Sequence, residues 1–321
     1  VQVNGVGILN SALGFNERIT AQIVAAPDSG LELAYGSLGY EQPVGPWGTT
    51  LGLTGSITDT DPGFSLSQFD VEGKSRSFTL QAEHPIIRSR NTNLFGRVLF
   101  DYRNVDSKNN IELTRKDRIR ALRAGAQIEF LDRLYNVGVN TIDLSVSQGL
   151  NDLGASDGGD ANLTRAAGDP QFTKGNIVLQ RLQRLTSSFN LLFQGRGQVA
   201  SGPLFSSEEF GLGGIGTVRG YDPSETVGDD GIAGKVELQW NSDSRFTQLF
   251  GFLDSGTVWN QDATTSEQKR NSLTSTGAGV RFNLPQDVDA EFVMALPLHR
   301  DIQTQGEHDP QFFFSAVSYT H

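Results

Sequence analysis

The chain has 321 residues, a formal net charge of −11, no cysteine and four histidines. The lack of cysteine excludes a disulfide scaffold and thiolate metal sites, and the histidines are too scattered along the chain for a zinc site. The acidic balance argues against nucleic-acid binding through a broad basic face, and there is no run of about 18 apolar residues that would predict a transmembrane helix. We therefore expect no metal, no cofactor and no nucleic-acid partner.

Alternation of apolar and polar side chains predicts β-strands along most of the chain. In residues 232–240, for example, Val236 lies on one face of an extended segment and Glu237 on the other. Such patterns predict fifteen strands, over residues 1–10, 17–26, 31–42, 47–59, 74–86, 91–104, 118–131, 135–149, 173–185, 187–201, 230–241, 246–260, 271–284, 287–298 and 310–320. Single-chain bacterial barrels close with an even number of strands, so either residues 208–213 form a short extra strand or the first strand lies before Val1.

The alternating strands are compatible with either a soluble sandwich or a membrane barrel. In a sandwich the apolar face forms the core, whereas in an outer-membrane barrel that face meets lipid and the polar face lines a wet lumen. Segments of about 10–13 residues, which suit tilted strands that cross a bilayer, favour the barrel. Aromatic residues near segment ends, such as Trp47 and Trp240, and tight turns that alternate with long polar loops favour it too. We therefore predict an all-β fold, a transmembrane antiparallel β-barrel of about 16 strands that forms one domain over residues 1–321.

Two short motifs have the spacing of nucleotide-binding or catalytic sites but lack the structural context that those sites need. Gly211, Gly213 and Gly216 have the spacing of a dinucleotide fingerprint, yet Pro223 prevents the helix that would have to follow. The nucleophile-elbow spacing at 154–158 lies in a polar loop and not between a strand and a helix. The sequence therefore predicts no enzyme activity.

Several stretches of the sequence together carry a family resemblance. They are FGLGGIGTVRGYDPSE at 210–225, GKVE at 234–237, GFLDSG at 251–256, YEQPVG at 40–45 and HPIIRSR at 84–90. These stretches resemble the two-partner secretion transporters, the TpsB family, which share a superfamily with the BamA barrel-assembly proteins. The resemblance implies a barrel of sixteen strands whose first strand lies upstream, and a long sixth extracellular loop that folds back into the lumen. The family's periplasmic transport-associated domains and plug helix have no counterpart here, so we expect residues 1–321 to be the barrel part of a longer protein.

The glycine-rich stretch also has a physical interpretation, as a loop that enters a crowded lumen. Gly213, Gly214, Gly216 and Gly220 permit positive φ angles and a close approach of the backbone to the barrel wall. Arg219 would then bring its charge into a confined space, away from bulk water. It therefore needs carboxylate partners, and a two-pronged contact suits the guanidinium group.

Candidate partners for Arg219 come from the alternation of the strands that follow. Glu237 lies on the polar face of its segment, and Asp254 shares a face with Phe252, opposite the side that suits lipid. The resemblance implies the same contacts, with Arg219 against Asp254, flanked by Phe252 and Glu237. It also implies a tip motif made of Val218, Arg219, Gly220 and Tyr221. The alternative is that Arg219 only packs the loop while Asp254 balances an unrelated lumen charge. The remaining arginines that we interpret as wall charges are Arg88, Arg97, Arg103, Arg196 and Arg281.

The resemblance implies a protein-translocating pore in the bacterial outer membrane. An exported partner, unfolded in the periplasm, would thread through the polar lumen without ATP and fold outside the cell. The alternatives are a BamA-like insertase that helps other barrels to fold, and a passive diffusion porin. The expected partners are the secreted exoprotein and outer-membrane lipid with lipopolysaccharide. A monomer is expected because a closed barrel needs no oligomer.

Overall fold

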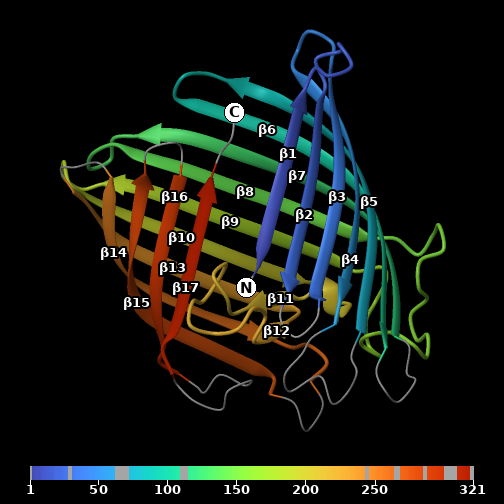
Figure 1. Cartoon of the computed structure of the whole chain (residues 1–321). Coiled ribbons are helices and arrows are strands. Elements are labelled where there is room, and N and C mark those ends of the chain that lie inside the picture. Colours follow the sequence, from blue (N-terminus) through green and yellow to red (C-terminus); the bar gives the residue numbers. More distant parts are fainter. Residues whose placement is uncertain are drawn as a thin grey trace.

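The computed structural model describes residues 2–27, 31–61, 72–108, 115–242, 246–263, 268–284, 288–299 and 309–318. Strands form almost the whole structure, in a sheet that curls so that its N-terminal (blue) and C-terminal (red) strands stand on the same side of the molecule (Figure 1). Val1, Asp287 and residues 319–320, which the sequence pattern assigns to strands, lie outside the described residues.

The wall is one antiparallel sheet of fifteen strands, each of which pairs with its neighbours in the chain. The strands are β1 (Val3–Asn10), β2 (Arg18–Pro27), β3 (Leu31–Val44), β4 (Thr49–Thr60), β5 (Glu72–Arg88), β6 (Thr92–Lys108), β7 (Arg115–Asp132), β8 (Gly138–Gly149), β9 (Thr173–Arg184), β10 (Phe189–Ala200), β13 (Asp230–Asn241), β14 (Thr247–Trp259), β15 (Arg270–Leu284), β16 (Val288–Pro297) and β17 (Gln311–Ser318). The prediction of an all-β, antiparallel fold is confirmed.

The segment 208–213 does not add a strand to this wall. It contains the short strand β11 (Phe210–Leu212), which pairs with β12 (Thr226–Gly228) in a separate two-stranded sheet. The wall therefore has fifteen described strands, where about 16 were expected, and β1 and β17 are its two edges. The suggestion of an extra wall strand at this position was wrong, because the segment pairs within its own loop.

Burial in the wall is the reverse of burial in a soluble sandwich. On β13, the apolar side chains of Ile232 and Leu238 are 58% and 47% exposed, whereas Glu237 between them in the alternation is only 3% exposed. A sandwich would bury the apolar row in its core, so this pattern agrees with a barrel whose outer face meets lipid. None of the helices in the described part of the chain is long and apolar enough to cross a bilayer.

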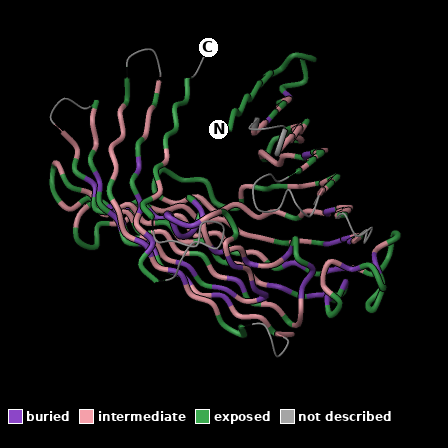
Figure 2. Tube along the Cα trace, turned by 60° about the horizontal axis from the view of Figure 1, so that its bottom comes forward, coloured by how far each residue is buried: buried purple, intermediate pink, exposed green. Residues whose placement is uncertain are grey.

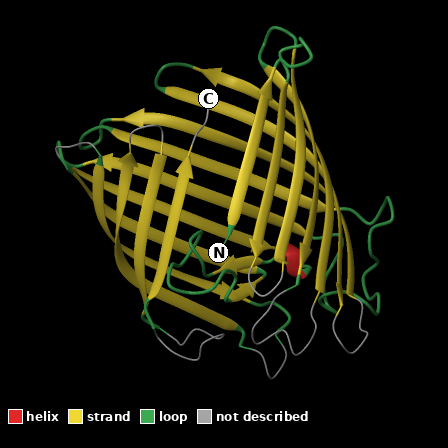
Figure 3. Cartoon of the chain, in the orientation of Figure 1, coloured by secondary structure: helices red, strands yellow, loops and turns green. Residues whose placement is uncertain are grey.

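The two ends of the wall differ in the length of their connections. Short turns join β5 to β6 and β9 to β10 at one end. At the other end lie two long loops, loop five (residues 150–172, between β8 and β9) and loop six (residues 201–229, between β10 and β13). Loop six contains the 3-10 helix η2 (Ser206–Glu208) and the β11–β12 hairpin, and it turns into the space that the sheet encloses (Figure 3).

Buried apolar side chains gather where the two long loops pack on the inside of the wall. One cluster joins Ile119 of β7, Leu163 of loop five and Phe205 of loop six. A second cluster joins Tyr221 of loop six to Leu273 of β15. In Figure 2 the buried segments lie in and beside these loops, whereas the edge strands β1 and β17 are mostly exposed. The core of the molecule therefore positions loop six.

Candidate functional site

Loop six reaches its tip through a tight reversal of the backbone that begins directly after β11. Gly213 and Gly214 both have positive φ angles, of 119° and 79°. A Cβ atom on Gly213 would lie 2.2 Å from the carbonyl oxygen of Asp222, so no other residue fits this position without a shift of the backbone. Gly216, in contrast, has ordinary φ and room for a methyl group, with its nearest neighbour, Arg196 Nη1, at 3.8 Å. Of the four loop glycines expected to permit positive φ angles, Gly213, Gly214 and Gly220 have them and Gly216 does not.

The tip motif packs against the strands near the C-terminal end of the sheet. Val218 and Tyr221 are buried, and the Tyr221 hydroxyl donates to the carbonyl oxygen of Thr274 on β15 at 3.0 Å. The same hydroxyl accepts a hydrogen bond from the backbone N–H of His299 at 3.2 Å. Gly220 has a φ of 90° and faces β16, where an added Cβ would meet the Cβ of Ala295 at 3.3 Å.

Arg219 lies between two carboxylates and an aromatic ring. Its Nε and Nη2 donate to the two carboxylate oxygens of Asp254, each at 2.7 Å, and its backbone N–H donates to the same group at 3.1 Å. Nη1 donates to Glu237 at 3.1 Å. The guanidinium carbon lies 3.5 Å from the centre of the Phe252 ring, in cation–π geometry. The structure thus brings together all four residues that the sequence placed at the tip and its lumen partners.

The register of two adjacent strands explains this arrangement. In the β13–β14 pair, Glu237 lies opposite Phe252 and Lys235 lies opposite Asp254. Because alternate residues of a strand face the same side, Glu237, Phe252 and Asp254 all point into the lumen. Arg219, Glu237 and Asp254 are 4%, 3% and 0% exposed, so the charges are removed from bulk water. Burial alone would lower the pKa of Arg219, but the carboxylates of Asp254 and Glu237 together outweigh it and raise the pKa, which keeps the guanidinium charged.

Glu237 has a second cation that the sequence interpretation missed. Arg281 of β15 donates to Glu237 at 2.6 Å and 3.2 Å, and it also donates to Glu291 of β16 at 3.2 Å. The sequence predicts only a wall charge for Arg281. Its inward parity on β15 was the available signal, but only the register of β15 against its neighbours shows that it reaches Glu237.

A second charged cluster lies where loop six leaves the wall. Glu208 of η2 accepts hydrogen bonds from Arg123 of β7 at 2.7 Å and 3.1 Å, and it forms an ion pair with Lys174 of β9 at 2.7 Å. Burial alone would raise the pKa of Glu208, but the neighbouring Arg123 and Lys174 outweigh it and lower the pKa to about 2. The carboxylate is therefore ionised at neutral pH and ties loop six to two strands of the wall.

Asp229, at the other end of loop six, ties that loop to loop five. Its carboxylate accepts from Arg165 of loop five at 2.5 Å, and from the backbone N–H groups of Leu204 and Gln261 at 2.7 Å and 2.9 Å. Burial alone would raise the pKa of Asp229, and the Arg165 guanidinium with these N–H groups lowers it. The sequence interpretation missed both anchors of loop six, Glu208 and Asp229, for which the only local signal was an acidic pair at each end of the loop.

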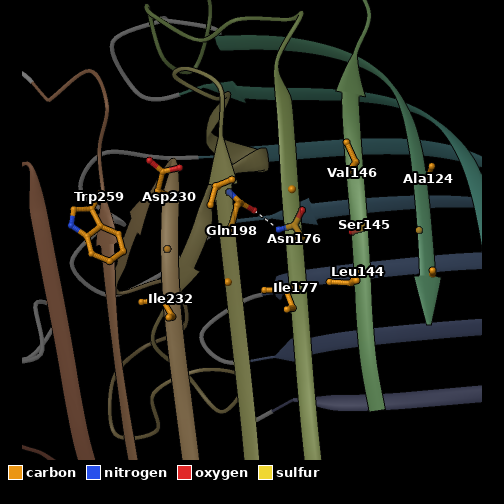
Figure 4. A pocket seen from close by; sticks show the side chains of 16 residues that line it. Ala124, Leu144, Ser145, Val146, Asn176, Ile177, Gln198, Asp230, Ile232 and Trp259 are labelled. Carbon is orange, nitrogen blue, oxygen red and sulfur yellow. Dashed lines mark hydrogen bonds between the residues drawn. The ribbon is translucent and has the colours of Figure 1, made fainter. Parts of the chain in front are cut away.

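One large hollow lies away from this site. It is an apolar furrow of about 930 Å³ on the outer face of β7 to β14, bordered by Leu144, Ile177, Ile232 and Trp259 (Figure 4). A hollow of about 190 Å³ beside Arg219 lies in the lumen instead. Among the described residues, no cluster of three or more His, Asp or Glu side chains is placed to hold a metal ion. The buried charges at the tip are arranged to brace a loop.

Comparison with known proteins relates this arrangement to one family. The family model of the haemolysin secretion/activation protein ShlB/FhaC/HecB matches residues 2–282. The heme/hemopexin transporter protein HuxB of Haemophilus influenzae (strain 86-028NP) is 23% identical over 320 residues, which cover 96% of this chain and 55% of HuxB. HuxB of the Rd strain is 24% identical over 315 residues, 95% of this chain and 54% of that protein. The chain spans about half the length of these relatives.

Solved structures of low sequence identity share the fold. CdiB from Escherichia coli matches with a TM-score of 0.81 and 19% identity, over 99% of this chain and 59% of that chain. CdiB from Acinetobacter baumannii matches with a TM-score of 0.75 and 18% identity, over 99% of this chain and 56% of that chain. BamA from Haemophilus ducreyi, in a form that lacks POTRA domains 1–3, matches with a TM-score of 0.69 and 14% identity, over 98% of this chain and 66% of that chain.

Proposed function

Because the chain belongs to the ShlB/FhaC/HecB family of haemolysin secretion/activation proteins, we propose that it forms a pore through which an unfolded partner exoprotein is secreted without ATP. Membership of this family confirms the TpsB resemblance and gives the barrel its place in the bacterial outer membrane. The cargo, the direction of transport and the role of each residue are parts of our proposal.

The main support for the proposal is that the tip of loop six is held in place inside a polar lumen. Arg219 bridges Asp254 and Glu237, and all three side chains are buried. Removing one partner of such a buried pair costs about 3–5 kcal/mol, because the other charge is left uncompensated. The tip is therefore held in one position against β13 and β14. We propose that the braced tip forms one side of the path that the exoprotein follows.

The rest of the lumen has the polarity that an extended polypeptide requires. Inward side chains such as Gln180 and Gln194 can exchange hydrogen bonds with the peptide groups of a passing chain, so that the chain need not bury unsatisfied polar groups. In our proposal, folding of the exoprotein beyond the long-loop end opposes its return and so gives transport its direction.

Three finer points belong to the same proposal. Residues 1–321 form the pore domain, and that domain acts as a monomer because a closed barrel needs no oligomer. The exposed apolar rows of the wall, which include Ile23, Leu38 and Ile57, are the surface that meets lipid and lipopolysaccharide.

A secretion assay tests the proposed function. Cells that make the full-length protein and its exoprotein partner would be compared with cells that lack the protein and with cells that carry Arg219→Ala. We expect the exoprotein in the medium only when the protein is present, and a fall of about tenfold or more with Arg219→Ala, in line with a lost buried ion pair. The amount of folded barrel, read from its altered mobility on unheated gels, should not change. Export that is independent of the protein would contradict the proposal, and an equal loss of export and of folded barrel would reduce Arg219 to a folding element.

A further inference from the structure

Two cations in the lumen, Arg196 and Lys235, form no ion pair with any carboxylate that the structure describes. We propose that they form a binding site for acidic side chains of the polypeptide in transit. This inference rests on the proposed secretion function, which it deepens by giving the pore a preference for carboxylates at one defined position beside the loop six tip.

The two side chains come from neighbouring strands and line the same small hollow. In the β10–β13 pair, Arg196 lies opposite Ala233, and Lys235 lies opposite Gln194. Arg196 faces the lumen because Gln198, two residues further along β10, donates to backbone oxygens of loop six. Lys235 faces the lumen because it shares its side of β13 with Glu237. The hollow between them has a volume of about 80 Å³ and is also lined by Gly216 of the loop six tip. This space suits a carboxylate group.

The described residues do not neutralise the charges of Arg196 and Lys235. Within the described part of the chain, no hydrogen bond or ion pair engages Arg196. The Lys235 ammonium group donates to the carbonyl oxygen of Ile215 at 2.7 Å, which orients it without cancelling its charge. No described carboxylate forms an ion pair with Lys235, although Asp254 lies opposite it in the β13–β14 register.

The nearby carboxylates are already engaged by other cations. Asp254 is held by Arg219 on both of its oxygens. Glu237 is held by Arg219 and Arg281. Asp143, the nearest acidic residue on the other side of Arg196 in the sheet register, is held by Arg97 on both oxygens at 2.6 Å. The two cations beside the hollow therefore keep a net positive charge, which an external anion can neutralise.

The chemistry of the pair favours a carboxylate on a flexible chain. The guanidinium group of Arg196 presents a planar fork of donors that matches a carboxylate, and the Lys235 ammonium adds a point charge beside it. Arg196 is exposed and Lys235 is half-buried. Water can therefore still screen them, so each contact is weak and short-lived, as transport requires. An unfolded exoprotein presents its Asp and Glu side chains free of internal partners.

Peptide binding to the purified full-length protein in detergent micelles tests the site. The probes are two fluorescently labelled, unstructured peptides of equal length, one built of Glu, Ser and Gly and the other with Gln in place of every Glu. Fluorescence anisotropy gives the Kd of each peptide. We expect the acidic peptide to bind more tightly than the neutral peptide, and R196Q/K235Q to weaken it about tenfold while leaving the neutral peptide unchanged.

A matched control variant removes one lysine and one arginine charge from another part of the barrel. Lys74 and Arg76 of β5 lie at the long-loop end of the wall, and both are exposed. K74Q/R76Q should leave both Kd values unchanged, and R196K/K235R, which keeps two positive charges, should retain binding. An equal loss of acidic-peptide binding in K74Q/R76Q would overturn the site, because a general charge effect would then explain it. An unchanged Kd in R196Q/K235Q, with a folded barrel, would also overturn it.

The same variant separates failure of this site from failure of the proposed function. Loss of acidic-peptide binding together with slower secretion of the exoprotein supports both. If peptide binding is unaffected while the wild-type protein secretes its partner, the proposed function stands and the site is wrong. If the wild-type protein binds the acidic peptide but secretes no partner in cells, the anion site stands and the secretion function is wrong.

Discussion

Asp254→Asn removes one negative charge from the loop six brace while keeping the size of the side chain. In the protein, the Asp254 carboxylate accepts two hydrogen bonds of 2.7 Å from the guanidinium of Arg219 and one of 3.1 Å from its backbone N–H. An asparagine has one acceptor oxygen, and its amide N–H groups would face other donors. Arg219 would keep only Glu237 as a charged partner.

The size of the effect follows from what remains around Arg219. Loss of one partner of a buried ion pair costs about 3–5 kcal/mol. Because Glu237 and the ring of Phe252 still stabilise the guanidinium, we expect the lower end, about 3 kcal/mol, which corresponds to a roughly hundredfold increase in opening of the tip. The barrel wall itself should stay intact, since its strand pairing does not depend on Asp254.

Hydrogen exchange followed by mass spectrometry measures this opening directly. Amides of residues 213–225 should exchange about a hundredfold faster in Asp254→Asn, while those of β5 and β6 keep their wild-type rates. The control is Asp143→Asn, which breaks another two-pronged Arg–Asp pair, with Arg97, in the wall away from the tip. Unchanged exchange at the tip in Asp254→Asn, or an equal increase in Asp143→Asn, would refute the reasoning.

Three further perturbations test other parts of the site. Since the pKa of Glu208 is about 2 in the folded protein, compared with 4.5 when unperturbed, the stability it gives to the base of loop six should be complete above pH 4.5 and be lost as the pH falls toward 2. Hydrogen exchange of loop six, corrected for the intrinsic effect of pH, should show this loss, and Glu208→Gln should remove the pH dependence. Gly213→Ala should disrupt the tip, because its Cβ would lie 2.2 Å from the carbonyl oxygen of Asp222, whereas Gly216→Ala should be tolerated. Secretion assays compare the two variants. Equal secretion by both would contradict this expectation. Tyr221→Phe loses two hydrogen bonds and should destabilise the tip by about 1–2 kcal/mol in the same exchange experiment, and wild-type exchange would show that the hydroxyl contributes little.

The strands of the wall could be predicted from the sequence because the alternation of apolar and polar residues that indicates them is local. Alternation puts Val236 on one side of a strand and Glu237 on the other, and a wall between lipid and a polar lumen favours that alternation. The same alternation placed Glu237 and Asp254 on the lumen side, where the structure has them. The link from Arg219 to these residues came from the family resemblance, since alternation alone does not say which loop enters the lumen.

The anchors of loop six could not be predicted because their partners are distant in the chain. Arg123 and Glu208 are 85 residues apart, and Arg165 and Asp229 are 64 residues apart. These contacts depend on how loops five and six pack against the inside of the wall, which follows no sequence period. The strand at Phe210–Leu212 illustrates the same limit, because its residues predict a strand but do not show that its partner lies in its own loop.

Crosslinking inside living cells tests the central claim, that the exoprotein passes through the lumen. A photoreactive residue would replace Gln194, which faces the lumen on β10, or its neighbour Phe193, which faces outward and is 40% exposed. The exoprotein would carry a C-terminal domain that folds before export and so halts it in transit. We predict crosslinks to the halted exoprotein from position 194 and none from position 193. Crosslinks from the outward position alone, or from neither position while secretion of the unmodified exoprotein continues, would contradict a path through the lumen.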